Sequence, residues 1–84
     1  MTYEIEYSNQ ANKFLKGLGK DITKRIINKI EEIRENPFRY LEHFEGKDVF
    51  KFRIGDYRAL IDIDHENKIL VVRVLDKRGR IYKR

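Results

Sequence analysis

With 84 residues, the chain can form one small domain that buries about 60–65% of the surface its unfolded form exposes. The absence of cysteine excludes disulfides, thiolate chemistry and sulfur-ligated zinc, and it fits a reducing cytoplasm. No apolar run approaches the roughly 20 residues of a membrane span, and the N-terminus lacks the apolar core of a secretory signal. We therefore expect a single cytoplasmic domain, residues 1–84, without membrane association.

The positive charge is unevenly distributed along the chain. The net charge is +5, and the tail from Asp76 to Arg84, with five cations and one anion, accounts for +4 of it. A local basic field favours a polyanionic partner such as a nucleic acid or an acidic protein. The alternative at this point is a charged surface that only contacts solvent.

The N-terminal half predicts one strand followed by two helices. Residues 3–7 alternate apolar or aromatic side chains with glutamates, as in a half-buried strand. Ser8 is a good N-cap for the short helix that follows. The apolar residues of this helix are spaced to form one stripe: Ala11, Phe14, Leu15 and Leu18. We expect Asp21 to cap a second helix, which carries an isoleucine at every third or fourth position and ends before Pro37.

The C-terminal half predicts strands. Residues 38–48 are expected to form a loop, and residues 50–54 a strand that alternates apolar and basic side chains. Gly55-Asp56 has glycine first, as a type II′ hairpin turn prefers. That turn sets the register of the hairpin and places Arg53 opposite Arg58.

Two long strands and a short one complete the predicted sheet. Residues 57–63 and 69–75 are expected strands on either side of a polar turn, and a short fifth strand is predicted near residues 80–83. The segment 69–75 is apolar at nearly every position, which is typical of a central strand buried on both faces. The order predicts an α+β fold, with two helices on one face of a mostly antiparallel sheet of four to five strands.

The predicted hairpin gathers positive charge on one face. Lys51, Arg53 and Arg58 share the face that points away from the helices, and Arg73 joins them if Val72 and Val74 face the helices. Like charges directly opposite in a sheet cost about 0.2–1 kcal/mol, which indicates that this face binds an anion. A solvated strand face is the alternative.

These segments resemble the RelE/ParE superfamily of toxins from toxin–antitoxin systems. The hairpin from Phe50 to Arg58 is similar to that family's alternating basic residues followed by Gly-Asp-Tyr-Arg. The tail from Lys77 to Tyr82 is similar to its final arginine with a tyrosine several residues later. The similarity covers essentially the whole chain and implies the β-α-α-β-β-β order.

The resemblance to RelE-like members implies a ribosome-dependent endoribonuclease that cleaves mRNA in the A site. In such members the 2′-hydroxyl attacks the adjacent phosphate without a metal or cofactor, leaving a 2′,3′-cyclic phosphate and a 5′-hydroxyl. The implied partners are a RelB-like antitoxin protein and the ribosome with its mRNA. The alternatives are a ParE-like poison of DNA gyrase and a basic nucleic-acid-binding module without catalysis.

The chemistry and the resemblance together suggest roles for individual residues. Arg58 is expected to clamp the phosphate with its guanidinium fork, and Arg78 is implied to assist the leaving group. Lys51 is the one hairpin candidate that could lose a proton, whereas Arg53 replaces a second lysine of some relatives and can only stabilise charge. The identity of the general base is therefore open. Tyr82 is expected to stack on a nucleotide or orient it.

The remaining polar residues carry weaker functional signals. The secondary candidates for RNA binding are Arg73, Lys77 and Arg80. His43 and His65 are isolated loop residues and poor candidates for a general base. The acidic residues of segment 62–66 lack the spacing of a calcium loop, so we expect a turn there and no metal site.

Overall fold

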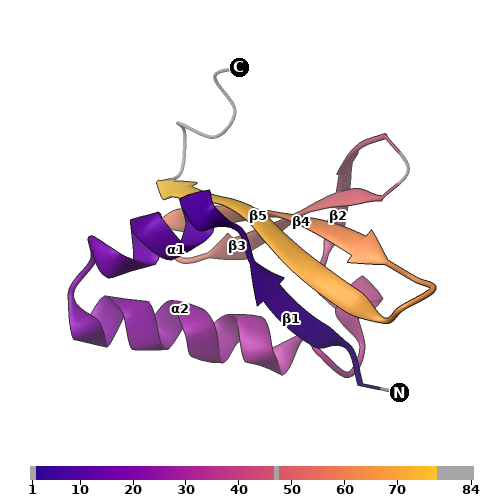
Figure 1. Ribbon diagram of the computed structural model, residues 1–84, viewed down its shortest axis with the longest axis horizontal. Helices are drawn as coiled ribbons and strands as arrows, with labels where there is room; N and C mark the ends of the chain where they lie inside the picture. Colours follow the sequence, from indigo (N-terminus) through magenta and orange to yellow (C-terminus); the bar gives the residue numbers. More distant parts are fainter. Residues whose placement is uncertain (1, 47, 78–84) are drawn as a thin grey trace.

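The computed structural model describes residues 2–46 and 48–77. The described chain begins with β1 (Glu4–Tyr7), α1 (Asn9–Lys16), α2 (Lys20–Glu32) and the short 3-10 helix η1 (Pro37–Arg39). It continues with β2 (Glu42–Glu45), β3 (Val49–Ile54), β4 (Tyr57–Asp64) and β5 (Ile69–Lys77). All five strands form one sheet, and both α-helices lie on the same side of it (Figure 1).

The sheet is mixed, with the strand order β1-β5-β4-β3-β2. The first strand, β1, pairs in parallel with β5, whereas the other neighbours are antiparallel. The predicted α+β fold is therefore confirmed. Residues 69–75 belong to an interior strand, as expected, because β5 lies between β4 and the edge strand β1, while β4 takes the middle position.

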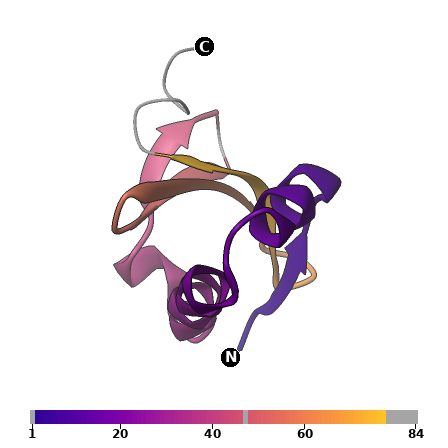
Figure 2. The ribbon, with the colours of Figure 1, turned by 90° about the vertical axis from the view of Figure 1, so that its left-hand side faces the viewer.

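The hydrophobic core lies between the helices and the sheet. Three isoleucines of the second predicted stripe, Ile26, Ile30 and Ile33, are at most 1% exposed. They belong to one apolar cluster with buried residues of the sheet, among them Leu70 and Val72. The end-on view shows the sheet curving over the two helices (Figure 2). One face of the sheet is thus taken up by packing, and the other is open for binding.

The helix boundaries follow local chemistry. The Ser8 Oγ accepts a hydrogen bond from the backbone N–H of Ala11 at 3.1 Å, which confirms the predicted N-cap of α1. The N-cap of α2 is Gly19 and not Asp21, because Lys20 is already helical. Asp21 lies in the first turn instead, where a carboxylate interacts favourably with the helix dipole. Within residues 2–46 and 48–77, neither helix has the length and apolarity that crossing a membrane requires.

The β3–β4 hairpin has the predicted turn and register. Gly55 has φ +58°, while Asp56 is not among the residues with positive φ, as a type II′ turn requires. Arg53 lies opposite Arg58, and Lys51 lies opposite Leu60. The hairpin prediction is confirmed at every pair.

The loop predicted for residues 38–48 is wrong. This segment contains the end of η1 and the edge strand β2, in which Glu42 lies opposite Lys51 and His43 opposite Phe50. A four-residue strand with three ionisable side chains has no clear apolar alternation, so only its pairing with β3 defines it. The fifth strand of the sheet is therefore β2. The fifth strand predicted near residues 80–83 lies outside the described residues.

Candidate active site on the open face of the sheet

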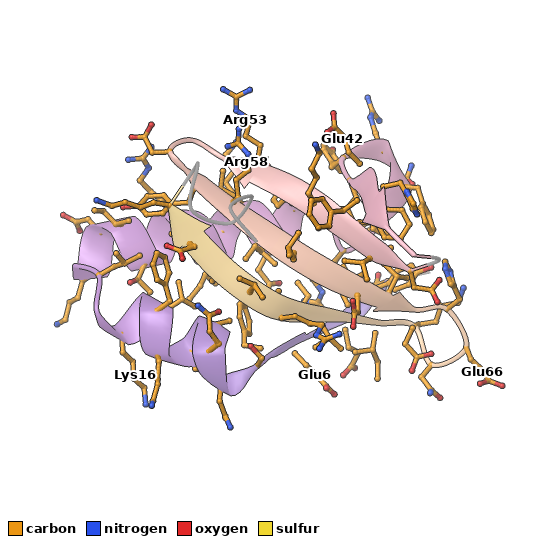
Figure 3. The ribbon with its side chains drawn as sticks, turned by 90° about the horizontal axis from the view of Figure 1, so that it is seen from above. Glu6, Lys16, Glu42, Arg53, Arg58 and Glu66 are labelled. Atoms are coloured by element: carbon orange, nitrogen blue, oxygen red, sulfur yellow. The ribbon has the colours of Figure 1, made fainter. Side chains whose placement is uncertain are left out.

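The open face of the sheet carries a polar hollow near the β3–β4 turn. This basic pocket has a volume of about 320 Å³, and its lining residues are Tyr40, Glu42, Lys51, Arg53 and Arg58. Figure 3 shows Arg53 and Arg58 close to the turn and Glu42 further along the same edge of the sheet. Larger hollows lie elsewhere on the molecule. The basic pocket is singled out because it combines three cations with a volume that suits one nucleotide-sized group.

Strand register explains why the three cations meet. Arg53 and Arg58 are directly opposite in the hairpin, and Lys51 is two residues from Arg53, so all three side chains lie on one face. The neighbouring Phe52 points to the other face and is buried in the core. The alternation of the strand therefore places the cations on the open face of the sheet.

Arg58 is the one charged side chain classed as buried among the described residues, with 8% exposure. Its Nη1 donates a hydrogen bond to its neighbour's backbone, the Tyr57 carbonyl, at 3.3 Å. The ion pairs found in the described part of the chain do not include Arg58. Asp76 lies opposite in the sheet, but its Oδ1 accepts a hydrogen bond from the backbone N–H of Lys77. A buried guanidinium of this kind favours an anionic ligand.

Glu42 is a member of the pocket that the sequence did not reveal. Its Oε1 lies 3.5 Å from the Nζ of Lys51, across the β2–β3 pair. The Glu42 side chain is 74% exposed and that of Lys51 34% exposed, so solvent reaches the pair. Had a strand been assigned to residues 42–45, antiparallel pairing would have suggested this neighbour. Because a loop was predicted for this segment, Glu42 was not recognised as a neighbour of Lys51.

Arg73 lies on the open face because of a β-bulge that was not predicted. Leu60 pairs with Val74 and Ile61 pairs with Val72, which leaves Arg73 as the extra residue of a β-bulge. Val72 faces the helices as expected, whereas Val74 shares the open face with Leu60. The Arg73 Nη1 lies 2.9 Å from Asp62 Oδ2. Arg73 is thus occupied by an ion pair and does not line the basic pocket.

The tail candidates are placed differently. Lys77 is exposed and lies opposite Tyr57, on the face that the helices cover, so it is on the other side of the sheet from Arg58. Arg78, Arg80 and Tyr82 lie outside the described residues. The described site therefore consists of the hairpin cations together with Tyr40 and Glu42.

The acidic segment after β4 forms a turn. The two carboxylate oxygens of Asp64 accept hydrogen bonds from the side chain and from the backbone N–H of Asn67, and these bonds, the side-chain one most, lower the pKa of Asp64. His65 stacks on Phe38 and lies 3.4 Å from a carboxylate oxygen of Asp48. Within the described ranges, no three His, Asp or Glu side chains are grouped in a way that could hold a metal ion.

Comparison with known proteins then decides the family. A family model described as the ParE toxin of the type II toxin–antitoxin system, parDE, matches residues 5–81. The chain belongs to the RelE/ParE family of toxins. The predicted family is thereby confirmed.

Relatives of this toxin are RelE proteins. A curated protein of Methanocaldococcus jannaschii, named as a RelE1 toxin, is 26% identical over 88 residues, covering 99% of this chain and 98% of the relative. The archaeal RelE–RelB complex from Pyrococcus horikoshii matches with a TM-score of 0.81 and 26% identity, over 95% of this chain and 99% of that one. RelBE2 from Mycobacterium tuberculosis has the same fold, with a TM-score of 0.82 and 23% identity, over 93% and 100% of the two chains. The protein is a RelE-like toxin of a toxin–antitoxin system.

Proposed function

We propose that this toxin is a ribosome-dependent endoribonuclease that cleaves mRNA in the A site and so inhibits translation. The observation that carries the proposal is Arg58, a buried guanidinium without an ion-pair partner among the described residues. It lines one pocket with Arg53 and Lys51. A phosphodiester that gains negative charge in its transition state fits such a pocket.

In this proposal, each pocket residue has a separate role in phosphodiester cleavage. Arg58 binds two phosphate oxygens through its planar fork, and Arg53 stabilises the charge that develops on the phosphorane. The 2′-hydroxyl attacks the adjacent phosphorus, which gives a 2′,3′-cyclic phosphate and a free 5′-hydroxyl. As the family resemblance implies, Arg78 assists the leaving group and Tyr82 orients the nucleotide. The reaction in this proposal needs neither a metal nor a cofactor.

The ribosome supplies the alignment that the pocket lacks. A hollow of about 320 Å³ holds one nucleotide-sized group, and RNA outside it has little to fix its orientation. The ribosome holds the codon in the A site and so fixes the RNA relative to the pocket. Such positioning of the reacting groups raises the rate by several powers of ten. Cleavage of free RNA is therefore expected to be feeble.

In the proposed setting, a RelB-like antitoxin neutralises the toxin in the cytoplasm. The solved RelE–RelB complex from Pyrococcus horikoshii supports this partner. Leu15, Leu18 and Ile27 line a hollow of about 410 Å³ beside the two helices, where apolar side chains of a flexible partner can dock. Several lysines border this hollow, so an acidic segment would also be attracted.

Primer extension on translated mRNA tests the nuclease proposal. The wild-type toxin is expected to create new 5′ ends aligned with codons. Arg58→Ala is expected to reduce them at least about 100-fold, because removing one preorganised donor to a developing oxyanion commonly has this effect. Lys13→Ala, which removes an exposed cation of α1 on the other side of the sheet, is the matched control. Equal cleavage by Arg58→Ala and wild type would contradict the role of the pocket.

A gyrase poison is the second candidate, because the matching family model is named for ParE. In that case the toxin blocks supercoiling by DNA gyrase and leaves translated mRNA intact. A supercoiling assay beside the primer extension separates the two functions. Retention of RNA on a gel without either activity would instead identify a module that only binds nucleic acid, with an affinity that falls steeply as salt rises.

A further inference from the structure

We propose that Glu42 is the general base of the reaction and takes the proton from the attacking 2′-hydroxyl. This assignment rests on the proposed nuclease function and names a residue that the hairpin motif does not contain. The sequence of the hairpin offered only Lys51 for this task, and the fold adds a carboxylate from the neighbouring edge strand β2.

Glu42 lies where the chemistry requires an acceptor. Of the described residues that line the basic pocket, it is the one carboxylate, and the others are three cations and Tyr40. Its register partner is Lys51, so its side chain lies on the same face as Arg53 and Arg58. A phosphate held by the arginines therefore places the adjacent ribose within the same hollow as the carboxylate.

The alternatives inside the pocket are weaker proton acceptors. Arg53 and Arg58 remain protonated in proteins, so they can stabilise charge but cannot accept a proton. The Nζ of Lys51 lies 3.5 Å from a carboxylate oxygen of Glu42, and an ammonium group has no lone pair with which to accept a proton. A glutamate side chain is ordinarily ionised at neutral pH and can accept a proton at once.

Solvent exposure of Glu42 agrees with this role. Its side chain is 74% exposed, and among the described residues its ion-pair partner is Lys51, so it can turn from Lys51 towards a bound ribose. When Glu42 takes the proton, the positive charge of Lys51 can stabilise the phosphorane.

The 2′-oxygen forms a bond to phosphorus while its proton moves to the Glu42 carboxylate, and the bond between phosphorus and the 5′-oxygen breaks. The departing 5′-oxygen takes a proton from water, and Glu42 later releases its proton to water. No oxidant, reductant or metal takes part in the step.

Single-turnover cleavage of mRNA on purified ribosomes, measured as a function of pH, tests the assignment. With a glutamate base, the wild-type rate constant is expected to stay constant between about pH 6 and 8.5. With a lysine base, it would rise about tenfold for each pH unit over this range. Glu42→Gln is expected to lower the rate constant about 10²- to 10⁴-fold, and Glu42→Asp is expected to restore part of it.

Glu66→Gln is the matched control, because it removes the same charge from an exposed turn at the far end of the sheet (Figure 3). Circular dichroism and thermal unfolding show whether each variant is folded; if Glu42→Gln is unfolded, Glu42→Asp and the wild-type pH profile decide. Cleavage by folded Glu42→Gln within about threefold of wild type, or a wild-type rate that climbs with pH, would overturn the assignment and leave the nuclease function standing. Absence of cleavage by wild type in the presence of ribosomes would overturn the proposed function and this role together.

Discussion

At the scale of single residues, Arg58 and Tyr7 are two polar groups with restricted access to water. Arg58 lines the basic pocket, where an anion can compensate its burial. The Tyr7 hydroxyl is buried on the other face and has no hydrogen-bond partner among the described residues. Burial, with a smaller contribution from the charge of Glu31, raises the pKa of Tyr7 to about 12. We propose that the first residue serves binding, and we expect the second to make folding sensitive to alkali.

Tyr7→Phe is expected to reduce the loss of stability at high pH. Between about pH 10 and 12 the tyrosine loses its proton in the unfolded chain but keeps it in the folded protein, so the free energy of unfolding falls as pH rises. With allowance for solvent screening, this contribution is about 1 kcal/mol at the alkaline end of the range. Urea unfolding of both proteins at neutral and alkaline pH measures it. An identical decline in both proteins would show that Tyr7 is not responsible.

At the scale of elements, backbone conformation at one turn sets the spacing of the site. The type II′ turn at Gly55 makes Arg53 and Arg58 direct neighbours across the β3–β4 hairpin. The positive φ of Gly55 is one that a residue with a Cβ adopts only at a cost. The glycine therefore contributes to the basic pocket although it does not line it.

Gly55→Ala is expected to destabilise the protein by about 1–2 kcal/mol, the cost of forcing a side chain into this backbone conformation. The matched control is Gly17→Ala, because Gly17 has φ −82° and an added Cβ would meet only ordinary contacts. Gly17→Ala is expected to leave stability unchanged or raise it by up to about 1 kcal/mol. Denaturant midpoints compare the two, and equal stability of both variants would contradict the strain argument.

Local signals in the sequence were enough to predict the β3–β4 hairpin. Features that depend on pairing between distant segments, such as β2 and the bulge at Arg73, were not predicted. The Gly-Asp turn and the alternation around Arg53 carry their own register, so three members of the pocket were predicted together. Glu42 was missed because β2 is short and polar, and its strand character comes from β3. The bulge at Arg73 was missed for the same reason, since an extra residue appears only when two strands are compared.

At the scale of the whole molecule, the open face is electrically polar. The cations of the basic pocket lie near the β3–β4 turn, whereas the acidic β4–β5 turn, which contains Glu66, lies towards the opposite end of the sheet (Figure 3). The acidic end repels a polyanion, and the basic end attracts it. An RNA strand is therefore expected to enter over the hairpin and to keep away from the β4–β5 turn.

Arg53→Gln is expected to reduce the salt dependence of RNA binding. For single strands, log affinity decreases with log salt concentration, and the steepness of this decrease is reduced by about 0.7 for each phosphate contact that is lost. Lys13→Gln removes an equal charge from the helical side and is expected to leave the slope unchanged. Fluorescence anisotropy with a labelled RNA oligonucleotide over a range of salt concentrations measures both slopes. Equal slopes for Arg53→Gln and wild type would contradict the proposed direction of approach.

The parallel pairing of β1 with β5 has a consequence for the order of events during synthesis. β1 finds its partner only after residues 69–72 have been made, and the Gln10 side chain must also wait for the backbone of Leu75, which it contacts with two hydrogen bonds. Contacts this distant in sequence form late and slow the folding of a chain. We therefore expect the nascent toxin to remain incomplete while its own message is translated. The β1–β5 pair would thus form only after most of the toxin's message has been translated.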